Sequence, residues 1–209
     1  IIFGISVVIG FVMHPKYNIY IIGVTAIGAL VVAVRQWAIN AQLSDNANFR
    51  FERILAWVNP EKFADDTGFQ TVQALYAIGS GGLFGKGLGK SLQKLGFIPE
   101  AQNDMIFSVI CEELGLFGAL CVLIVFGLML WRFVYIATNS PDLTGCLLVV
   151  GVFAHIAIQV ILNVAVVTNL IPNTGISLPF ISYGGTSVLF LMAEMGIVLN
   201  VSSRIRMEV

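Results

Sequence analysis

The sequence is poor in charge. Of its 209 residues only 11% are Asp, Glu, Lys or Arg, whereas about a quarter is usual in soluble domains. So few charged side chains cannot cover a water-facing surface, which excludes a soluble globular enzyme. Because 57% of the residues are apolar, the chain is not disordered either. A formal net charge of −1 offers no basic surface to nucleic acid, so an integral membrane protein remains.

Cysteine and histidine are also scarce. The two histidines are far apart, and the three cysteines lie inside apolar runs without the spacing of metal ligands. We interpret Cys111, Cys121 and Cys146 as small apolar side chains, and we expect neither a disulfide framework nor a protein-built metal site.

What the sequence does have is long apolar runs, which predict an all-α polytopic membrane protein of about five membrane helices. Residues 1–13 are too few to cross a bilayer, so we expect the chain to begin inside a membrane helix and to be the C-terminal part of a larger protein. The predicted helices are residues 1–13, 18–34, 105–137, 143–168 and 187–201.

The polar residues gather in two connections. Residues 35–104 hold 14 of the 23 charged residues, and residues 169–186 contain two prolines and three glycines that rule out a regular helix. When the helices alternate in direction, four basic residues fall on one side, and the positive-inside rule predicts that this side is cytoplasmic; they are Lys16, Arg132, Arg204 and Arg206. Both connections then face outward. The second is predicted to be a re-entrant or extracellular segment packed beside the first.

Within residues 35–104 two short helices are expected. Residues 49–58 predict an amphipathic helix at the membrane interface, and residues 68–78 predict a helix with Gln70 and Gln73 one turn apart. A glycine-rich run follows at Gly79–Ser91.

This glycine-rich run ends in Gly89-Lys90-Ser91 but is not a phosphate loop, because Phe84 stands where that motif needs glycine. Lys86 and Lys90 either meet a substrate pyrophosphate or neutralise lipid headgroups.

Six acidic or polar residues, in three groups, carry open alternatives. Asp104 stands where the polar insert meets an apolar run, and it is either a functional carboxylate or the cap of the next helix. Glu112 and Glu113 either line a cavity or form a structural pair with Arg50, Arg53 or a helix that this chain lacks. His155, Gln159 and Asn163 form one stripe on a helix, which serves either helix–helix contact or a substrate channel.

Three segments resemble the SEDS family, which includes FtsW, RodA and SpoVE. They are GFQTVQALYAIGSGGLFGKGLGKS at Gly68–Ser91, GFIPEAQNDMIFSVICEELG at residues 96–115 and LIPNTGISLPFISYGGTS at Leu170–Ser187. The resemblance runs from Phe49 to Arg204 and is strongest to the FtsW/SpoVE branch. It implies a bundle of ten membrane helices with a large extracellular loop, of which this chain resembles the last five.

The resemblance also implies an activity. SEDS proteins polymerise lipid II into glycan strands in the bacterial plasma membrane, together with a class B penicillin-binding protein and other division or elongation proteins. The family's essential aspartate, in Pro-Glu-x-x-x-Asp, corresponds to Asp104. We expect it to act as general base in an inverting transfer that releases undecaprenyl pyrophosphate, with Mg²⁺ or Mn²⁺ as a possible aid to the leaving group. The residues predicted to contact substrate are Gln70, Gln73, Lys86, Lys90, Glu100, Glu113 and Ser182.

Two other functions stay open. A lipid II translocase would use the intramembrane Glu112, Glu113 and His155 and the broken segment after residue 169 without any glycosyl transfer. A scaffold that recruits division proteins would use helix surfaces alone. The choice between division, elongation and sporulation also stays open.

Overall fold

The computed structural model describes residues 29, 30, 32, 33, 49–63, 68–91 and 102–205. These residues form helices and irregular connections without a strand. The predicted helix 1–13 lies outside them, as does 18–34 apart from four helical residues. The elements are α3 (Phe49–Val58), the 3₁₀ turn η2 (Pro60–Phe63), α4 (Phe69–Gly81), α5 (Ile106–Thr138), α6 (Leu143–Val167) and α7 (Gly185–Ser203).

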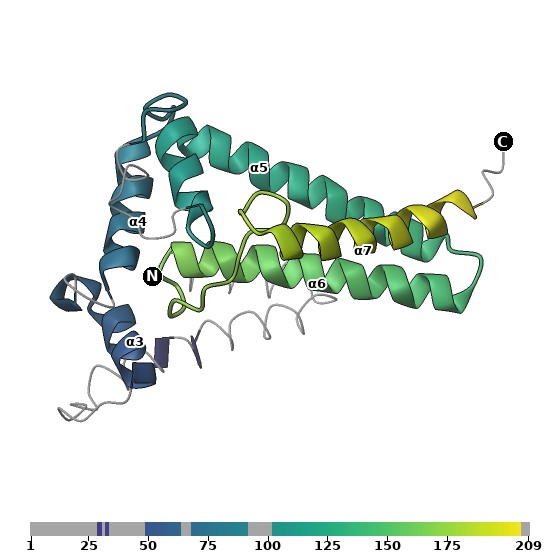
Figure 1. The fold of residues 1–209 in the computed structure, drawn as a ribbon, viewed down its shortest axis with the longest axis horizontal. Helices are drawn as coiled ribbons and strands as arrows, with labels where there is room; N and C mark the ends of the chain where they lie inside the picture. The colour runs from purple at the N-terminus through teal and green to yellow at the C-terminus, as the bar shows by residue number, and fades with distance from the viewer. Residues whose placement is uncertain (1–28, 31, 34–48, 64–67, 92–101, 206–209) are drawn as a thin grey trace, which may run out of the picture.

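Three helices, α5, α6 and α7, are long and apolar enough to cross a membrane. They run side by side in alternating directions (Figure 1). Their outward faces carry exposed apolar side chains such as Trp131, which is 71% exposed, and Phe190, which is 67% exposed. Exposed aromatic residues of this size suit a lipid-facing surface rather than a water-facing one. The chain is therefore a multi-pass helical membrane protein, as the apolar runs predict.

The bundle core lies between these helices and the connection after α6. Its fully buried side chains come from all four segments, which fixes their relative positions. They include Met105, Val149, Ile156, Val167, Leu178 and Val198.

The turn between α5 and α6 closes one end of the bundle. Asp142 is the N-cap of α6, and its carboxylate accepts a hydrogen bond from the Gly145 backbone N–H at 3.1 Å. Such a cap satisfies one of the free N–H groups at the start of a helix.

At the opposite end, α5 is broken. Gly115 has φ 70° and ψ −168°, so a short helical piece, 106–114, precedes the membrane-spanning piece, 116–138. The short piece runs beside α4, and the chain turns before the long piece begins (Figure 1). The apolar run predicts the helix ends to within a residue, but it does not predict this break.

The glycine-rich loop after α4 makes the break possible. The Lys86 and Gly87 N–H groups donate to the Glu112 and Glu113 carbonyls, each at 2.9 Å. On the other side of the break, Leu116 and Phe117 donate to the carbonyls of residues 82 and 83 at 3.0 and 3.2 Å. The loop thus takes up backbone groups that an unbroken helix would pair internally.

The remaining predicted elements are present. The interfacial helix 49–58 is α3, and the helix predicted from residue 68 is α4, which continues three residues beyond Ile78. The connection Thr168–Gly184 contains no helix, as its prolines and glycines predict. It packs at the same end of the bundle as α3 and α4 (Figure 1).

Candidate functional site

Asp104 lies at the junction of four segments. It precedes α5, whose N-cap position is occupied by Met105. Its half-buried side chain points toward α4 and the connection after α6, because Oδ1 accepts from Gln70 Nε2 at 3.0 Å. A Cβ on Gly175 would lie 3.8 Å from Oδ2. The carboxylate therefore contacts other segments, and its position close to a helix N-terminus favours the ionised form.

A directed chain of hydrogen bonds holds this carboxylate. The Gly175 N–H donates to Asn173 Oδ1 at 3.1 Å, and Asn173 Nδ2 donates to Gln70 Oε1 at 2.9 Å. The Gln70 amide then has its Nε2 directed at Asp104. Because each amide has one oxygen acceptor and one nitrogen donor, a backbone N–H at the start fixes the orientation of every group in the chain.

Asn163 connects the same site to α6. Its side-chain Nδ2 donates to the Asp104 carbonyl at 2.8 Å and to the Ile176 carbonyl at 2.6 Å. Asn163 is fully buried, so neither carbonyl can exchange this donor for water. One side chain thus fixes both the backbone that bears Asp104 and the loop that faces it.

Two residues of the connection after α6 adopt left-handed backbone conformations, Asn169 with φ 56° and Phe180 with φ 62°. Asn169 exchanges hydrogen bonds with Trp57 of α3: the Trp57 indole donates to its carbonyl at 3.1 Å, and its amide donates to the Trp57 carbonyl at 3.4 Å. Left-handed asparagine is tolerated because its short amide bonds locally. The pair attaches α3 to the end of α6, next to the site.

Ser182 shapes the last part of this connection. Its buried hydroxyl accepts from the Leu178 N–H at 2.7 Å, and its own N–H donates to the Leu178 carbonyl at 3.0 Å. The next residue, Tyr183, donates its N–H to the Gln102 carbonyl at 2.8 Å. The structure therefore uses Ser182 to close a turn against the segment that carries Asp104.

A cavity of about 530 Å³ lies between the segment before α5 and the start of α7, and it is lined by residues on either side of Asp104 in the chain, Gln102 and Ile106, but not by Asp104 itself. Its polar lining comes from Gln102, Ser182 and Tyr183, and its apolar lining comes from Ile106, Ile181 and Val188. A mixed lining at the end of a helix bundle suits an amphipathic ligand.

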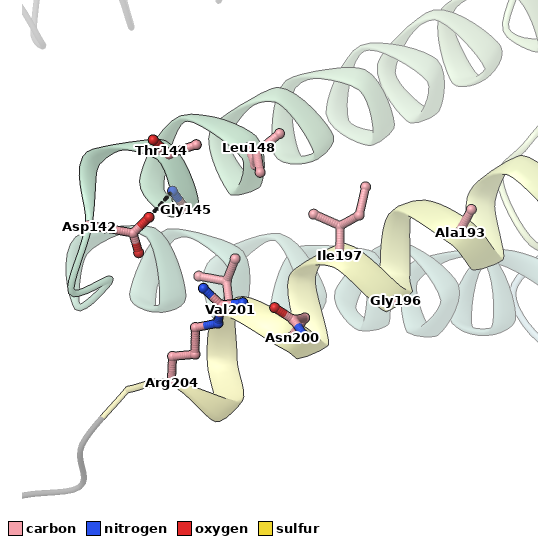
Figure 2. Close-up of a pocket in the computed structure, with 10 residues that line it drawn as sticks. All are labelled: Asp142, Thr144, Gly145, Leu148, Ala193, Gly196, Ile197, Asn200, Val201 and Arg204. Atoms are coloured by element: carbon pink, nitrogen blue, oxygen red, sulfur yellow. Dashed lines mark hydrogen bonds between the residues drawn. The ribbon is translucent and has the colours of Figure 1, made fainter.

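A second groove, of about 440 Å³, lies at the opposite end of the bundle, between the start of α6 and the end of α7 (Figure 2). Asp142 lines it while capping α6, and Arg204 lies across from it on α7. The length of the bundle separates this groove from Asp104, so it plays no part in the site.

Glu112 occupies the far end of the short piece of α5. It is fully buried, and its Oε1 lies 2.7 Å from Lys86 Nζ. Ser91 donates to Oε2 at 2.5 Å, and Ser80 donates to Oε1 at 3.5 Å. Of the two alternatives for Glu112, the structure shows an ion pair, and Lys86, which the sequence did not suggest, is a partner.

The structure brings only part of the predicted substrate set together. Gln70 lies on Asp104, and Gln73 is half-buried one turn further along α4. Lys86 and the exposed Lys90 lie in the loop at the other end of α4. The part of α4 between Gln70 and this loop is at least ten residues long, which is about 15 Å at 1.5 Å per residue. Glu113 is half-buried beside Glu112, and Glu100 lies outside the described residues.

Two site residues were not singled out by the sequence. Asn173 and Gly175 lie in a quoted motif, where Asn-Thr-Gly is a signal for an Asx turn, but nothing local indicates that the turn reaches Gln70. Asn163 belongs to the polar stripe on α6, for which helix–helix contact and a substrate channel are the two predicted roles, and the structure shows that it contacts neighbouring segments. His155 of the same stripe also makes such a contact, because its Nδ1 lies 2.9 Å from Oε1 of Glu194 on α7.

The described residues contain no group of three or more His, Cys, Asp or Glu side chains that could hold a metal ion. The hydrogen-bond partners described above for Asp104 and its backbone are amide groups. Asp104 could contribute a carboxylate to a divalent cation, and Mg²⁺ is often held by one or two carboxylates together with substrate phosphates.

The fold and the site define a class, namely multi-pass helical membrane proteins with an acidic site at the end of the bundle. The model of the cell cycle protein family FtsW/RodA/SpoVE matches residues 1–207, and the chain belongs to this family. The predicted membership is confirmed.

The relatives support the same branch. Stage V sporulation protein E of Bacillus subtilis (strain 168) is 49% identical over 75% of this chain and 43% of its own length. A probable peptidoglycan glycosyltransferase FtsW of the same organism is 46% identical over 73% of this chain and 38% of its own length. A probable FtsW of Saccharophagus degradans is 38% identical over 99% of this chain and 54% of its own length. The chain thus spans about half the length of these relatives or less.

A solved structure agrees with the fold. A chain from work titled "Structural coordination of polymerization and crosslinking by a peptidoglycan synthase complex" is similar with a TM-score of 0.61 and 28% sequence identity. The similarity covers 99% of this chain and 55% of that chain. The elements described above therefore correspond to part of a larger helical bundle in that protein.

Proposed function

We propose that the protein containing this chain is a peptidoglycan glycosyltransferase that polymerises lipid II into glycan strands. The observation that carries the proposal is the half-buried carboxylate of Asp104, held by Gln70 and faced by Gly175 at the junction of α4, α5 and the connection after α6. A site of this kind suits acid–base chemistry on a hydroxyl group, and relatives named peptidoglycan glycosyltransferase support the reaction class.

In the proposed reaction the 4-hydroxyl of the acceptor GlcNAc attacks C1 of the donor MurNAc with inversion. Asp104 takes the hydroxyl proton as the new C–O bond forms, and undecaprenyl pyrophosphate leaves with the electron pair of the broken bond. Gln70 holds Oδ1 in place, and Oδ2 lies on the side of Gly175. The mixed cavity next to Gln102 and Tyr183 receives the boundary between the polar and the isoprenoid parts of the substrate.

Other assignments complete the proposal. A divalent cation, Mg²⁺ or Mn²⁺, held by Asp104 and the pyrophosphate would neutralise charge on the leaving group. Substrate contacts by Gln73, Lys90, Glu100 and Glu113 involve more distant parts of the large substrate. A class B penicillin-binding protein is the proposed partner, because the similar solved chain belongs to a peptidoglycan synthase complex. The site end is proposed to face outward from the bacterial plasma membrane.

The test is glycan synthesis from lipid II by the full-length protein with its transpeptidase partner. Asp104→Asn should lower the rate by about 10²–10⁴-fold, because the amide cannot take the proton. Asp142→Asn is the matched control, since asparagine caps a helix as well as aspartate and lies at the other end of the bundle. Near-normal strand synthesis by Asp104→Asn would remove Asp104 from the mechanism.

Experiments on the same purified proteins distinguish the polymerase from the translocase. A translocase without glycosyl transfer would yield no glycan and would move labelled lipid II across sealed vesicles. The relatives are named for glycosyl transfer rather than for transport, and this favours the polymerase.

A further inference from the structure

The α4 helix and the short piece of α5 are joined at both ends. At one end Gln70 contacts Asp104 at 3.0 Å. At the other end Glu112 receives Lys86, Ser91 and Ser80 from the end of α4 and the loop that follows it. The two helices lie against each other between these contacts. A change at the Glu112 end is therefore transmitted along a rigid helix to the Asp104 end.

Small residues form the surface between the two ends. Ala74 and Ala77 are fully buried, and a Cβ on Gly81 would lie 2.0 Å from the Cys111 carbonyl oxygen. Small residues allow close approach and interlock less than large side chains would. The polar contacts at the two ends therefore contribute to how far α4 lies along α5.

The Glu112 contacts are suited to this task. A fully buried carboxylate must keep its partners, because losing one leaves a charge without compensation in a low-dielectric interior. Its ion pair with Lys86 can form at only one register of the two helices. A slip of one helical turn, about 5.4 Å, would break the pair and would also move Gln70 away from Asp104.

The loop reinforces the same register. Gly85 and Gly115 approach so closely that a Cβ on Gly115 would lie 2.4 Å from the Gly85 nitrogen. Lys86 is thus held by its backbone, which donates to the Glu112 carbonyl at 2.9 Å, and by its side chain, which pairs with the Glu112 carboxylate. The backbone and the side chain of Lys86 therefore contact the same helical turn of α5.

We propose that Lys86 and Glu112 are positioning residues that set the register of α4 on α5 and so place Gln70 on Asp104. The inference rests on the proposed function for its catalytic consequence, and it assigns Lys86 to the fold of the site rather than to the substrate pyrophosphate. Removal of the pair misplaces the base without removing a substrate contact.

The kinetic test uses the full-length protein with its partner and lipid II. Lys86→Met should lower kcat about 10-fold or more, since small misplacement of catalytic groups is costly, while KM stays within about twofold. Lys86→Arg should restore most of kcat. Lys62→Met, which removes one exposed lysine charge from η2, is the control and should leave both constants unchanged. A rise in KM at constant kcat would overturn the proposal in favour of pyrophosphate binding.

A second measurement does not depend on activity. In a background with Cys111, Cys121 and Cys146 changed to Ala, Gln70→Cys and Asp104→Cys are bridged by a short bifunctional thiol reagent. Adding Lys86→Met or Glu112→Gln should lower the bridging yield several-fold, whereas adding Lys62→Met should not. Unchanged bridging overturns the proposal. Absence of glycan synthesis by the wild-type protein with normal bridging would instead refute the proposed function alone.

Discussion

At the scale of single residues, the site depends on buried side chains that bond to other segments. Asn163 is the clearest case, because its Nδ2 serves two carbonyls from two different segments. Gln159 lies one turn earlier on α6, and the side-chain oxygens of both amides are buried without a hydrogen-bond partner among the described residues. The two positions therefore differ through the Nδ2 of Asn163, which holds two carbonyls.

This contrast gives a prediction for stability. Asn163→Leu should lower the free energy of unfolding by about 1–3 kcal/mol, because two buried carbonyls lose their donor. Gln159→Leu should be close to neutral, because it removes a buried oxygen that already lacks a partner in this part of the chain. Thermal unfolding of the full-length protein in detergent measures both. Equal losses for the two variants would contradict the assigned role of Asn163.

Asp104 and Gln70 were predictable from the sequence, the first by motif and the second as a polar residue on a short helix. Asn173 was not, because its contact with Gln70 spans 103 residues and depends on how the connection after α6 folds back. Likewise, charge alone does not distinguish Lys86, which has a buried partner, from Lys90, which is exposed. A local sequence pattern shows which chemical groups are present, whereas the partner of each group is known only from the tertiary structure.

At the scale of elements, the break in α5 and the glycine-rich loop form one unit. The apolar run predicts a membrane helix but not the break, because a single glycine is tolerated in membrane helices and leaves the hydropathy of the run unchanged. The sequence shows that the loop is rich in glycine but gives no structural reason for it. The structure supplies the reason, which is that the loop backbone lies very close to the backbone of α5. Gly85 has φ +75°, and a Cβ there would lie 2.2 Å from the Glu113 carbonyl oxygen.

Alanine at these glycines tests the unit. Gly85→Ala and Gly115→Ala should destabilise the protein by more than the about 1–2 kcal/mol that left-handed backbone alone costs, because both also force backbone atoms apart. Gly89 has φ +78°, and a Cβ there would meet no atom within 4 Å, so Gly89→Ala should lower the free energy of unfolding only by the cost of the left-handed backbone. Unfolding in detergent measures the three variants. A similar loss at all three positions would show that the close approach contributes nothing.

Helices α6 and α7 are coupled by the pair His155–Glu194. The stripe on α6 correctly predicts that His155 contacts a neighbouring helix, whereas the partner on α7 was not predicted because Glu194 is a lone acidic residue in an apolar run. A double-mutant cycle with His155→Ala and Glu194→Ala should give a coupling of about 0.6 kcal/mol, and at most about 1.7. Additive effects in denaturant titration would mean that the contact is energetically silent.

At the scale of the whole molecule, the two ends differ in kind. One end carries the site, α3, α4 and the glycine-rich loop, and the other carries the α5–α6 turn and the end of α7 (Figure 1). Arg132 and Arg204 belong to the second end, and by the positive-inside rule this is the reason for the proposal that the site faces outward.

Thiol labelling in intact cells tests this orientation. In the background without native cysteines, Leu88→Cys lies in the exposed glycine-rich loop, and Thr138→Cys lies at the end of α5. A membrane-impermeant maleimide should label Leu88→Cys directly and Thr138→Cys only after permeabilisation. The reverse pattern would place the site in the cytoplasm and would contradict the proposed substrate access.

The interrupted α5 also constrains how the protein is made. In hydrocarbon, each peptide group without a hydrogen-bond partner costs several kcal/mol. Insertion of the stretch around Gly115 into lipid is therefore unfavourable until the glycine-rich loop pairs with its backbone groups. Because that loop precedes α5 in the chain, it is synthesised first and is available when α5 leaves the translocation machinery. Biogenesis should therefore be ordered, with docking of the loop required before α5 reaches its final depth.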